Sequence, residues 1–240
     1  HLFSLNLDIV SEIFWTQWSK ESAELPNIWK YDNYIFDIYE IGIKTQEESL
    51  KNSVQWLNQL RIPGVYDVGG LGACTLIKRR VLEHGVDFSR ISNISYAGED
   101  RHFCIRAVVH GFKLSVDTHY PCFHIYREEY LPQVEKWKER NRVWDKRVTK
   151  PQGNKLCLAM LVRNEADRYL REVLESAKKY INCAVILDDA SEDDTVKVCR
   201  EVLNDIPLNL VSNQIPGFSN EIALRKQLWN LALESKAEWF

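Results

Sequence analysis

The feature that most constrains the fold is a regular alternation of apolar runs and amphipathic stretches over residues 155–240. The runs 155–162, 184–187 and 208–211 have the length and composition of buried parallel strands. Between the first two runs, residues 165–180 carry a single apolar stripe at helical spacing. Strand, helix, strand, helix, strand is the order of a parallel, doubly wound sheet, so this part of the chain is expected to form an α/β unit.

The first half of the chain has a less regular pattern. It predicts a strand within residues 8–14, helices over 45–60 and 99–110, and a strand at 113–116. Gly111 follows the second helix, at a position where a left-handed cap favours glycine. We therefore expect α and β structure here as well.

Composition and charge exclude several classes of protein. The 240 residues carry a formal net charge of −3, which argues against a general nucleic-acid binder. No apolar run approaches the roughly 18 to 20 residues that span a bilayer, so no transmembrane segment is expected. Most of the six cysteines lie inside apolar or helical runs and none forms a Cys-x-x-Cys pair, which favours reduced, structural thiols. Such cysteine usage predicts a cytoplasmic protein.

A polar, charged stretch separates the two halves of the chain. Residues 128–150 are rich in Glu, Lys and Arg, and residues 151–154 (Pro-Gln-Gly-Asn) end the stretch with turn-forming residues. All six histidines precede it. We predict a boundary near residue 150, with a first segment at 1–127, a charged linker at 128–154 and a second segment at 155–240.

Two adjacent acids, Asp188 and Asp189, directly follow an apolar run. At the carboxyl edge of a parallel sheet such groups can accept hydrogen bonds from a ribose hydroxyl or a base N–H. The glycine-rich dinucleotide fingerprint is absent after the first apolar run, where residues 163–165 read Arg-Asn-Glu, so a NAD-type site is not expected. The alternative is that Asp189 and Ser191 form only a turn and a helix cap.

Residues 160–165 and 187–195 resemble the opening of a family 2 glycosyltransferase with the GT-A fold. The strand, the Asn-Glu pair and the Asp-Asp-x-Ser-x-Asp-Asp-Thr run occur at the spacing of that family. The resemblance covers residues 155–240 and implies that Asp189 contacts the base of a nucleotide-sugar. The nucleotide-binding residues implied in this way are Arg163, Asn164, Glu165, Asp188, Asp189 and Ser191.

Residues 98–107 and the glycine-rich loop 69–74 resemble the acceptor side of the same fold. The resemblance implies that Asp100 is the general base toward the acceptor hydroxyl, with Glu99 as its partner. A carboxylate at the start of a helix can take the proton that an attacking hydroxyl must lose. The alternative is that both acids only stabilise the N-terminal end of the helix dipole.

A histidine beyond this region matches a metal ligand of related GT-A enzymes. The resemblance assigns this role to His124, with His119 as the second choice. It implies a divalent metal, Mn²⁺ or Mg²⁺, that neutralises the departing diphosphate. The Asp-x-Asp motif that holds this metal in the family does not occur in the 240 residues. The alternative is an ordinary, hydrogen-bonded histidine.

The fold implied by the resemblance is α/β and Rossmann-like, with a mostly parallel sheet and flanking helices, present as two partial domains. The acceptor-side segment 1–127 comes first and the nucleotide-binding segment 155–240 second, which reverses the order of a single domain. We interpret the chain as a fragment of a tandem two-domain member, inactive alone without the Asp-x-Asp motif. A permuted single domain is the alternative.

The predicted function is transfer of a sugar from a nucleotide-sugar donor to a hydroxyl of a glycan, lipid or peptide. The alternative is a non-catalytic nucleotide-binding or scaffold module, which the missing motif favours. The aromatic segment 15–48 is expected to help shape the acceptor pocket. A third interpretation is a carbohydrate-binding surface with Trp15, Trp18 and Trp29, which suit a core or a domain interface equally well.

Overall fold

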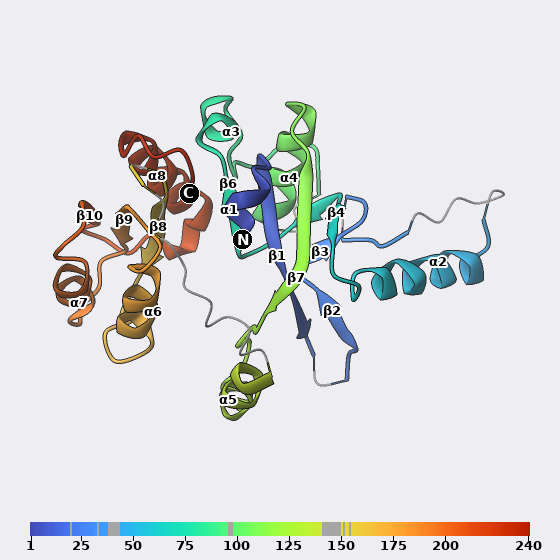
Figure 1. The fold of residues 1–240 in the computed structure, drawn as a ribbon. Helices are drawn as coiled ribbons and strands as arrows, with labels where there is room; N and C mark the ends of the chain where they lie inside the picture. Colours follow the sequence, from blue (N-terminus) through green and yellow to red (C-terminus); the bar gives the residue numbers. More distant parts are fainter. Residues whose placement is uncertain are drawn as a thin grey trace. The chain divides into compact units, whose positions relative to one another are not determined.

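The structure, a computed structural model, describes most of the chain as mixed α/β (Figure 1). The described residues cluster into two compact units. Unit 1 comprises residues 1–76 and 95–146, and unit 2 comprises residues 77–94 and 147–240. The α/β class expected from the sequence is confirmed. The described ranges are 1–19, 21–32, 34–37, 44–95, 98–140, 150, 152–153 and 155–240.

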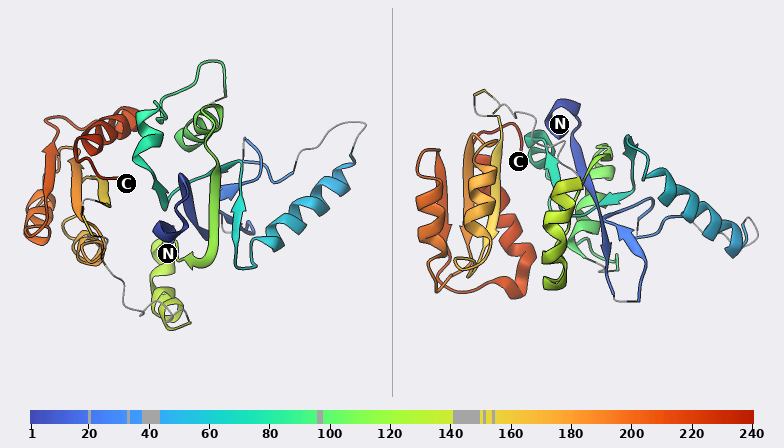
Figure 2. Two further views of the ribbon diagram at one scale, coloured as in Figure 1. Left: turned by 45° about the horizontal axis from the view of Figure 1, so that its top comes forward. Right: turned by 60° about the horizontal axis from the view of Figure 1, so that its bottom comes forward.

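The main sheet of unit 1, among the described residues, consists of β1 (Ile9–Gln17), β2 (Glu24–Pro26), β4 (Val65–Asp67), β6 (Thr75–Ile77) and β7 (Leu114–Cys122). The order is β2-β1-β7-β4, and β6 also pairs with β1. Strand β1 runs parallel to β7 and antiparallel to β2, whereas β4 runs antiparallel to β7. The long strands β1 and β7 lie side by side in all views (Figures 1 and 2). The sheet of this unit is therefore mixed.

A second, two-stranded sheet in unit 1 pairs β3 (Ile28–Trp29) with β5 (Gly70–Leu71) in antiparallel register. Asn27, the residue before β3, is buried, and its side chain forms hydrogen bonds with the backbone of β1 and of Ala73. Its Oδ1 accepts a hydrogen bond from Phe14 N at 3.0 Å, and its Nδ2 donates to Glu12 O and to Ala73 O at 3.2 Å each. This amide fixes the chain that leads into β3 against β1.

Helix α4 (Glu99–Val109) carries the two predicted acids, Glu99 and Asp100, in its first turn. It starts after Gly98, and Gly111 follows its end with a φ of +84°, in agreement with the predicted left-handed cap. The helix packs against β7 and β5 and buries Phe103 almost completely. The predicted helix over residues 99–110 is therefore confirmed.

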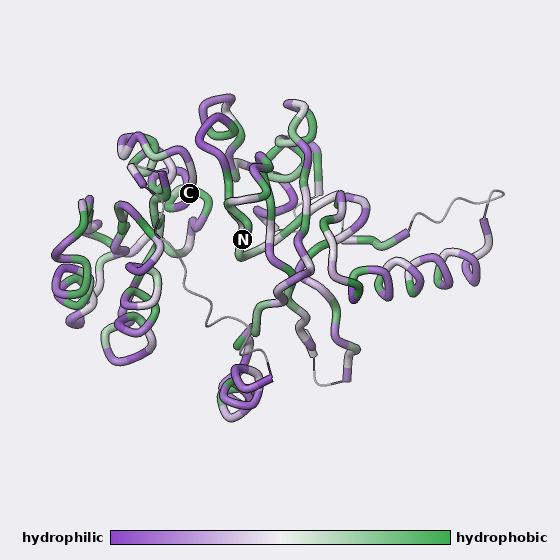
Figure 3. Tube along the Cα trace, in the orientation of Figure 1, coloured by the Kyte–Doolittle hydropathy of each residue, from purple (hydrophilic) through white to green (hydrophobic). Residues whose placement is uncertain are grey.

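Helix α2 (Gln46–Gln59) confirms the other helix predicted in the first half. Thr45 and Glu48 form a capping box, in which each side chain bonds to the backbone of the other residue. Hydrophobic and hydrophilic residues alternate along the helix (Figure 3). Trp56 is buried, whereas Leu50 is exposed. The short elements of this unit are α1 (Leu2–Leu5), η1 (Glu128–Tyr130) and α5 (Leu131–Arg140).

The sheet of unit 2 is parallel and has the order β10-β9-β8. Helices α6 and α7 lie on one face of these strands and α8 lies on the other (Figures 1 and 2). The predicted order of strand, helix, strand, helix, strand is confirmed. The bounds are β8 (Cys157–Val162), α6 (Leu170–Ala177), β9 (Cys183–Asp188), α7 (Thr195–Val202), β10 (Leu208–Ser212), η3 (Phe218–Asn220) and α8 (Glu221–Glu234).

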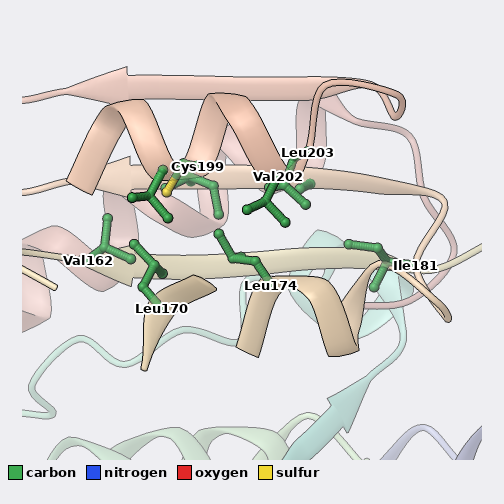
Figure 4. Packing of buried hydrophobic residues seen from close by; sticks show 10 residues of the cluster. Val162, Leu170, Leu174, Ile181, Cys199, Val202 and Leu203 are labelled. Carbon is green, nitrogen blue, oxygen red and sulfur yellow. The ribbon is translucent and has the colours of Figure 1, made fainter. Parts of the chain in front are cut away.

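The core of unit 2 forms where α6 and α7 cover the sheet (Figure 4). Fully burying an aliphatic side chain of this size contributes about 1.5–3 kcal/mol, so this layer stabilises the unit. Its buried residues are Val162, Leu170, Leu174, Ile181, Ala184, Ile186, Val198, Cys199, Val202 and Leu203.

The interpretation of Ser191 as a helix cap was wrong. Helix α7 has Asp194 as its N-cap, and the hydroxyl of Ser191 instead accepts a hydrogen bond from Asn164 N at 2.9 Å. Helix α8 has Asn220 as its N-cap, with Oδ1 accepting from Ala223 N. Asparagine is among the residues favoured at this position.

Residues 77–94, which contain α3 (Arg79–Glu83), belong to unit 2 rather than to the unit that holds most of segment 1–127. Ile77 and Phe240 exchange two backbone hydrogen bonds, at 3.0 and 3.1 Å. Trp239 forms an antiparallel bridge to Lys78 and a parallel bridge to Leu156. The predicted linker begins as η1 and α5, and residues 141–149, 151 and 154 lie outside the described residues.

Candidate functional site

Unit 1 contains a cavity of about 570 Å³ whose wall is mostly aromatic and aliphatic. Its polar wall residues include Asn27, Asp100 and His124. Two of these, Asp100 and His124, are predicted site residues that lie 24 positions apart in the sequence. The aromatic wall residues are Phe14, Trp18, Trp29, Tyr34, Phe36 and Tyr126. The fold therefore brings a carboxylate, an imidazole and several aromatic rings to one cavity.

The indole of Trp29 is held in the cavity wall by the backbone of β5. Trp29 is only 4 % exposed, and its ring centre lies 4.4 Å from that of Tyr34. A methyl group placed on Gly70 would overlap three atoms of the indole. The glycine at this position is therefore required by the close approach of ring and backbone.

Replacing Gly70 by alanine is expected to lower the free energy of unfolding of unit 1 by about 1–3 kcal/mol, because a rigid buried ring must move. The matched control is Gly72→Ala, whose added methyl would meet Asn27 O at 3.4 Å and Asp100 Oδ2 at 3.5 Å, which is ordinary contact. The control is expected to stay within about 0.5 kcal/mol of the wild type. Urea unfolding followed by circular dichroism measures both; equal stabilities would contradict the packing described for Trp29.

The carboxylate of Asp100 reaches the cavity wall because α4 is fixed at its start. Arg101 Nη2 donates to Asp32 Oδ2 at 3.0 Å, and Arg101 Nη1 donates to Ser95 O at 2.9 Å. One turn on, Cys104 is buried and its sulfur accepts from Leu71 N at 3.4 Å. These bonds set the first turn of the helix, so Asp100 has a defined position on the wall.

Tyr34 lies over the start of α4. Its hydroxyl would be 2.6 Å from a methyl group placed on Gly98. Burial raises the pKa of Tyr34 to about 12, and the charges of Asp100 and Glu99 act in the same direction. The phenol therefore stays protonated at neutral pH, as a hydrogen-bond donor close to two carboxylates.

His124 is held between a hydroxyl and aromatic rings. Its Nδ1 lies 2.7 Å from Thr16 Oγ1, and its ring centre lies 4.4 Å from that of Phe14 and 6.0 Å from that of Trp18. Burial lowers the pKa of His124, so the neutral imidazole is favoured. In the part of the chain that the structure describes, His124 does not belong to any group of three potential metal ligands.

The predicted acids of unit 2 lie at the carboxyl end of β9 and are almost fully buried. Asp189 Oδ1 accepts from Gly217 N at 2.8 Å and from Asn213 Nδ2 at 3.3 Å. Asp188 Oδ1 accepts from Ser191 N at 3.2 Å. Both carboxylates thus hold loops of the unit in place. For Asp189 this agrees with the turn role that the alternative interpretation gave it.

The loop after β8 is joined to the loop after β9. Ser191 Oγ accepts from Asn164 N at 2.9 Å, and Asn164 Oδ1 accepts from Glu192 N at 2.8 Å. Glu165 N donates to Thr195 Oγ1 at 2.7 Å. Arg163 begins the first of these loops. The six residues predicted for nucleotide binding are therefore neighbours at the carboxyl edge of the sheet.

The aromatic residues singled out in the sequence separate in the structure. Trp18 and Trp29 line the cavity, as do Tyr34 and Phe36 from the same segment. Trp15 does not line it; the guanidinium of Arg61 stacks over its ring at 3.9 Å. Sequence reasoning missed Phe14 and Tyr126. The tyrosine is two residues beyond His124, a spacing that places both on one side of an extended chain.

Comparison of the sequence with models of known protein families found no match, and comparison with curated proteins found none either. Among the described residues, no helix has both the length and the apolar character needed to cross a membrane.

Proposed function

We propose that this chain is part of a nucleotide-sugar-dependent glycosyltransferase with the GT-A fold and that the aromatic cavity of unit 1 receives the acceptor. The observation that supports the proposal is the position of the Asp100 carboxylate on the wall of that cavity. The acceptor is a glycan, a lipid or a peptide that presents a hydroxyl group. In this proposal unit 2 is the start of a second such domain and binds a nucleotide of its own through the loops after β8 and β9.

The composition of the wall suits a sugar. A pyranose ring has apolar C–H faces, which pack on aromatic rings, and a rim of hydroxyls that require polar partners. Trp18 and Tyr126, with ring centres 5.0 Å apart, are both about half exposed. Asp100 and the Tyr34 hydroxyl are polar groups in a wall that is otherwise mostly apolar.

Asp100 is the general base in the proposed reaction. The acceptor oxygen forms a bond to the anomeric carbon of the donor while the bond from that carbon to the diphosphate breaks. The hydroxyl proton passes to the Asp100 carboxylate, which lies in the first turn of α4. The protonated Tyr34 and the neutral His124 orient the hydroxyls of the acceptor, and Glu99 lies beside the base in the same helical turn.

A divalent metal, Mn²⁺ or Mg²⁺, belongs to the proposed activity by resemblance. It would neutralise the leaving diphosphate. The described residues around His124 do not fit such an ion, because one imidazole beside a hydroxyl and aromatic rings does not make a ligand set. No step above depends on it.

A non-catalytic nucleotide-binding or scaffold module is the second candidate. One observation favours it: the 240 residues contain no Asp-x-Asp, the motif that holds the metal in the family. A module of this kind binds a nucleotide but has no use for a sugar acceptor. Binding of simple glycosides therefore separates the two candidates.

The test is a titration of the chain with a panel of methyl glycosides, followed by tryptophan fluorescence. We expect at least one glycoside to bind, and we expect Gly72→Ala to weaken this binding about tenfold, the equivalent of 1.4 kcal/mol. The added methyl group would lie in the cavity wall, 3.5 Å from Asp100 Oδ2. This is an ordinary van der Waals distance, so the fold is not disturbed. Absence of binding across the panel, or binding that Gly72→Ala leaves unchanged, would overturn the proposal in favour of the module.

A further inference from the structure

Three potential metal ligands gather in unit 1 outside the aromatic cavity. They are His1, Asp117 and His119, and one ligand atom from each lies within 4.8 Å of the others. Asp117 and His119 are two residues apart on β7, a spacing that directs both side chains to the same face of the strand. His1 immediately precedes α1. None of the three lines the aromatic cavity.

The carboxylate of Asp117 joins the two imidazoles. His119 Nδ1 lies 2.6 Å from Asp117 Oδ1, and His1 Nε2 lies 3.2 Å from Asp117 Oδ2. The Asp117 side chain is completely buried, whereas those of His1 and His119 are 32 % and 39 % exposed. The site therefore has a buried carboxyl group at its bottom and two partly exposed imidazoles at its open side.

The charge of this cluster is incompletely satisfied. Among the described residues, none donates a well-aligned hydrogen bond to Asp117 Oδ2, although His1 Nε2 lies within ion-pair distance. A second carboxyl group, that of Glu12, is only 6 % exposed, is paired with Asp117 in the register of β1 and β7, and forms a side-chain hydrogen bond with it. Two buried carboxyl groups side by side repel each other when both are charged, and a bound cation offsets that repulsion.

We propose that His1, Asp117 and His119 form a binding site for a divalent transition-metal ion of the Zn²⁺ class. Two imidazole nitrogens and one carboxylate oxygen are a set that Zn²⁺ and Co²⁺ accept, whereas Mg²⁺ and Ca²⁺ prefer oxygen ligands. At Zn²⁺ bond lengths of about 2.0–2.2 Å the three ligand atoms must approach one another. The two partly exposed imidazoles can rotate to do so. This inference does not depend on sugar transfer.

The test is calorimetric titration of the chain with Zn²⁺ and with Co²⁺, together with the visible absorption of bound Co²⁺. We expect one ion per chain and a loss of affinity of at least about tenfold in His119→Ala, since even second-shell losses cost 10–100-fold. The matched control is His110→Ala, which removes an exposed histidine at the end of α4 and is expected to bind as the wild type does.

The test also needs a stated contrary outcome and a second variant. An ion chelated by His1 alone would bind equally well to His119→Ala, and that outcome would overturn the proposal, as would a wild type that binds neither ion. His119→Gln, which keeps a polar side chain of similar size, repeats the test, with circular dichroism confirming that both variants are folded.

Discussion

Replacing Asp100 by asparagine is expected to lower the rate of sugar transfer about 10²- to 10⁴-fold in the protein that carries this chain, the usual contribution of a general base. Asparagine has the same shape as aspartate but cannot accept the proton of the acceptor hydroxyl. Asp100 is in the first turn of α4, so the lost interaction with the helix dipole costs only about 0.3–1 kcal/mol of stability. The variant should therefore fold.

The measurement for Asp100→Asn is kcat at saturating donor and acceptor, with the free energy of unfolding determined in parallel. Glu47→Gln is the control, because Glu47 is an acid in the first turn of α2 that does not line the cavity. It should keep wild-type activity. If Asp100→Asn transferred sugar within threefold of the wild type, the carboxylate would serve only the helix dipole, as the alternative interpretation holds.

Replacing Asp189 by asparagine is expected to lower the free energy of unfolding of unit 2 by about 2–4 kcal/mol. The side chain is completely buried and accepts hydrogen bonds from Gly217 N and Asn213 Nδ2. An amide group there turns an NH₂ toward at least one of these donors, which leaves buried N–H groups without an acceptor. The loop between β10 and α8 then loses its anchor.

The control for this prediction is Asp194→Asn. Asp194 is the N-cap of α7, makes no side-chain cap hydrogen bond, and its side chain is 72 % exposed. Its contact with Lys197 is a surface pair, so the change should remain within about 0.5 kcal/mol of the wild type. Urea unfolding followed by circular dichroism compares the two variants. An Asp189→Asn protein as stable as Asp194→Asn would contradict the anchoring role.

Much of unit 2 could be predicted because its pattern is local. The apolar run 184–187 has the length of a buried strand and lies between two amphipathic stretches, and β9 spans Cys183–Asp188. The start of α6 was less predictable. The stripe suggested residue 165, whereas the helix begins at Leu170, because the preceding loop bonds to the loop after β9. A helical period does not reveal such a contact.

Unit 1 was less predictable because its pairings are non-local. Strand β1 pairs in parallel with β7, which lies a hundred residues later in the chain. The predicted strand at 113–116 runs on to Cys122 through Asp117, and aspartate is depleted in strands. The resemblance singled out Asp100 and His124, but no sequence pattern connects them with Phe14 or Tyr126 across the cavity.

The metal cluster illustrates the same limit. The spacing of Asp117 and His119 is readable once β7 is known, because alternate residues of a strand share a face. Nothing in the sequence brings His1 to them. Only the pairing of β1 with β7, with α1 leading into β1, places its imidazole beside Asp117.

The central claim, that a sugar occupies the aromatic cavity of unit 1, is tested most directly by the indole N–H signals of the eight tryptophans in a ¹H–¹⁵N NMR spectrum. Each indole gives one signal, and substitution assigns it. On addition of a glycoside, the account predicts shifts for Trp18 and Trp29, which line the cavity, and none for Trp229 and Trp239 of unit 2. Unchanged Trp18 and Trp29 signals, or shifts confined to unit 2, would contradict it.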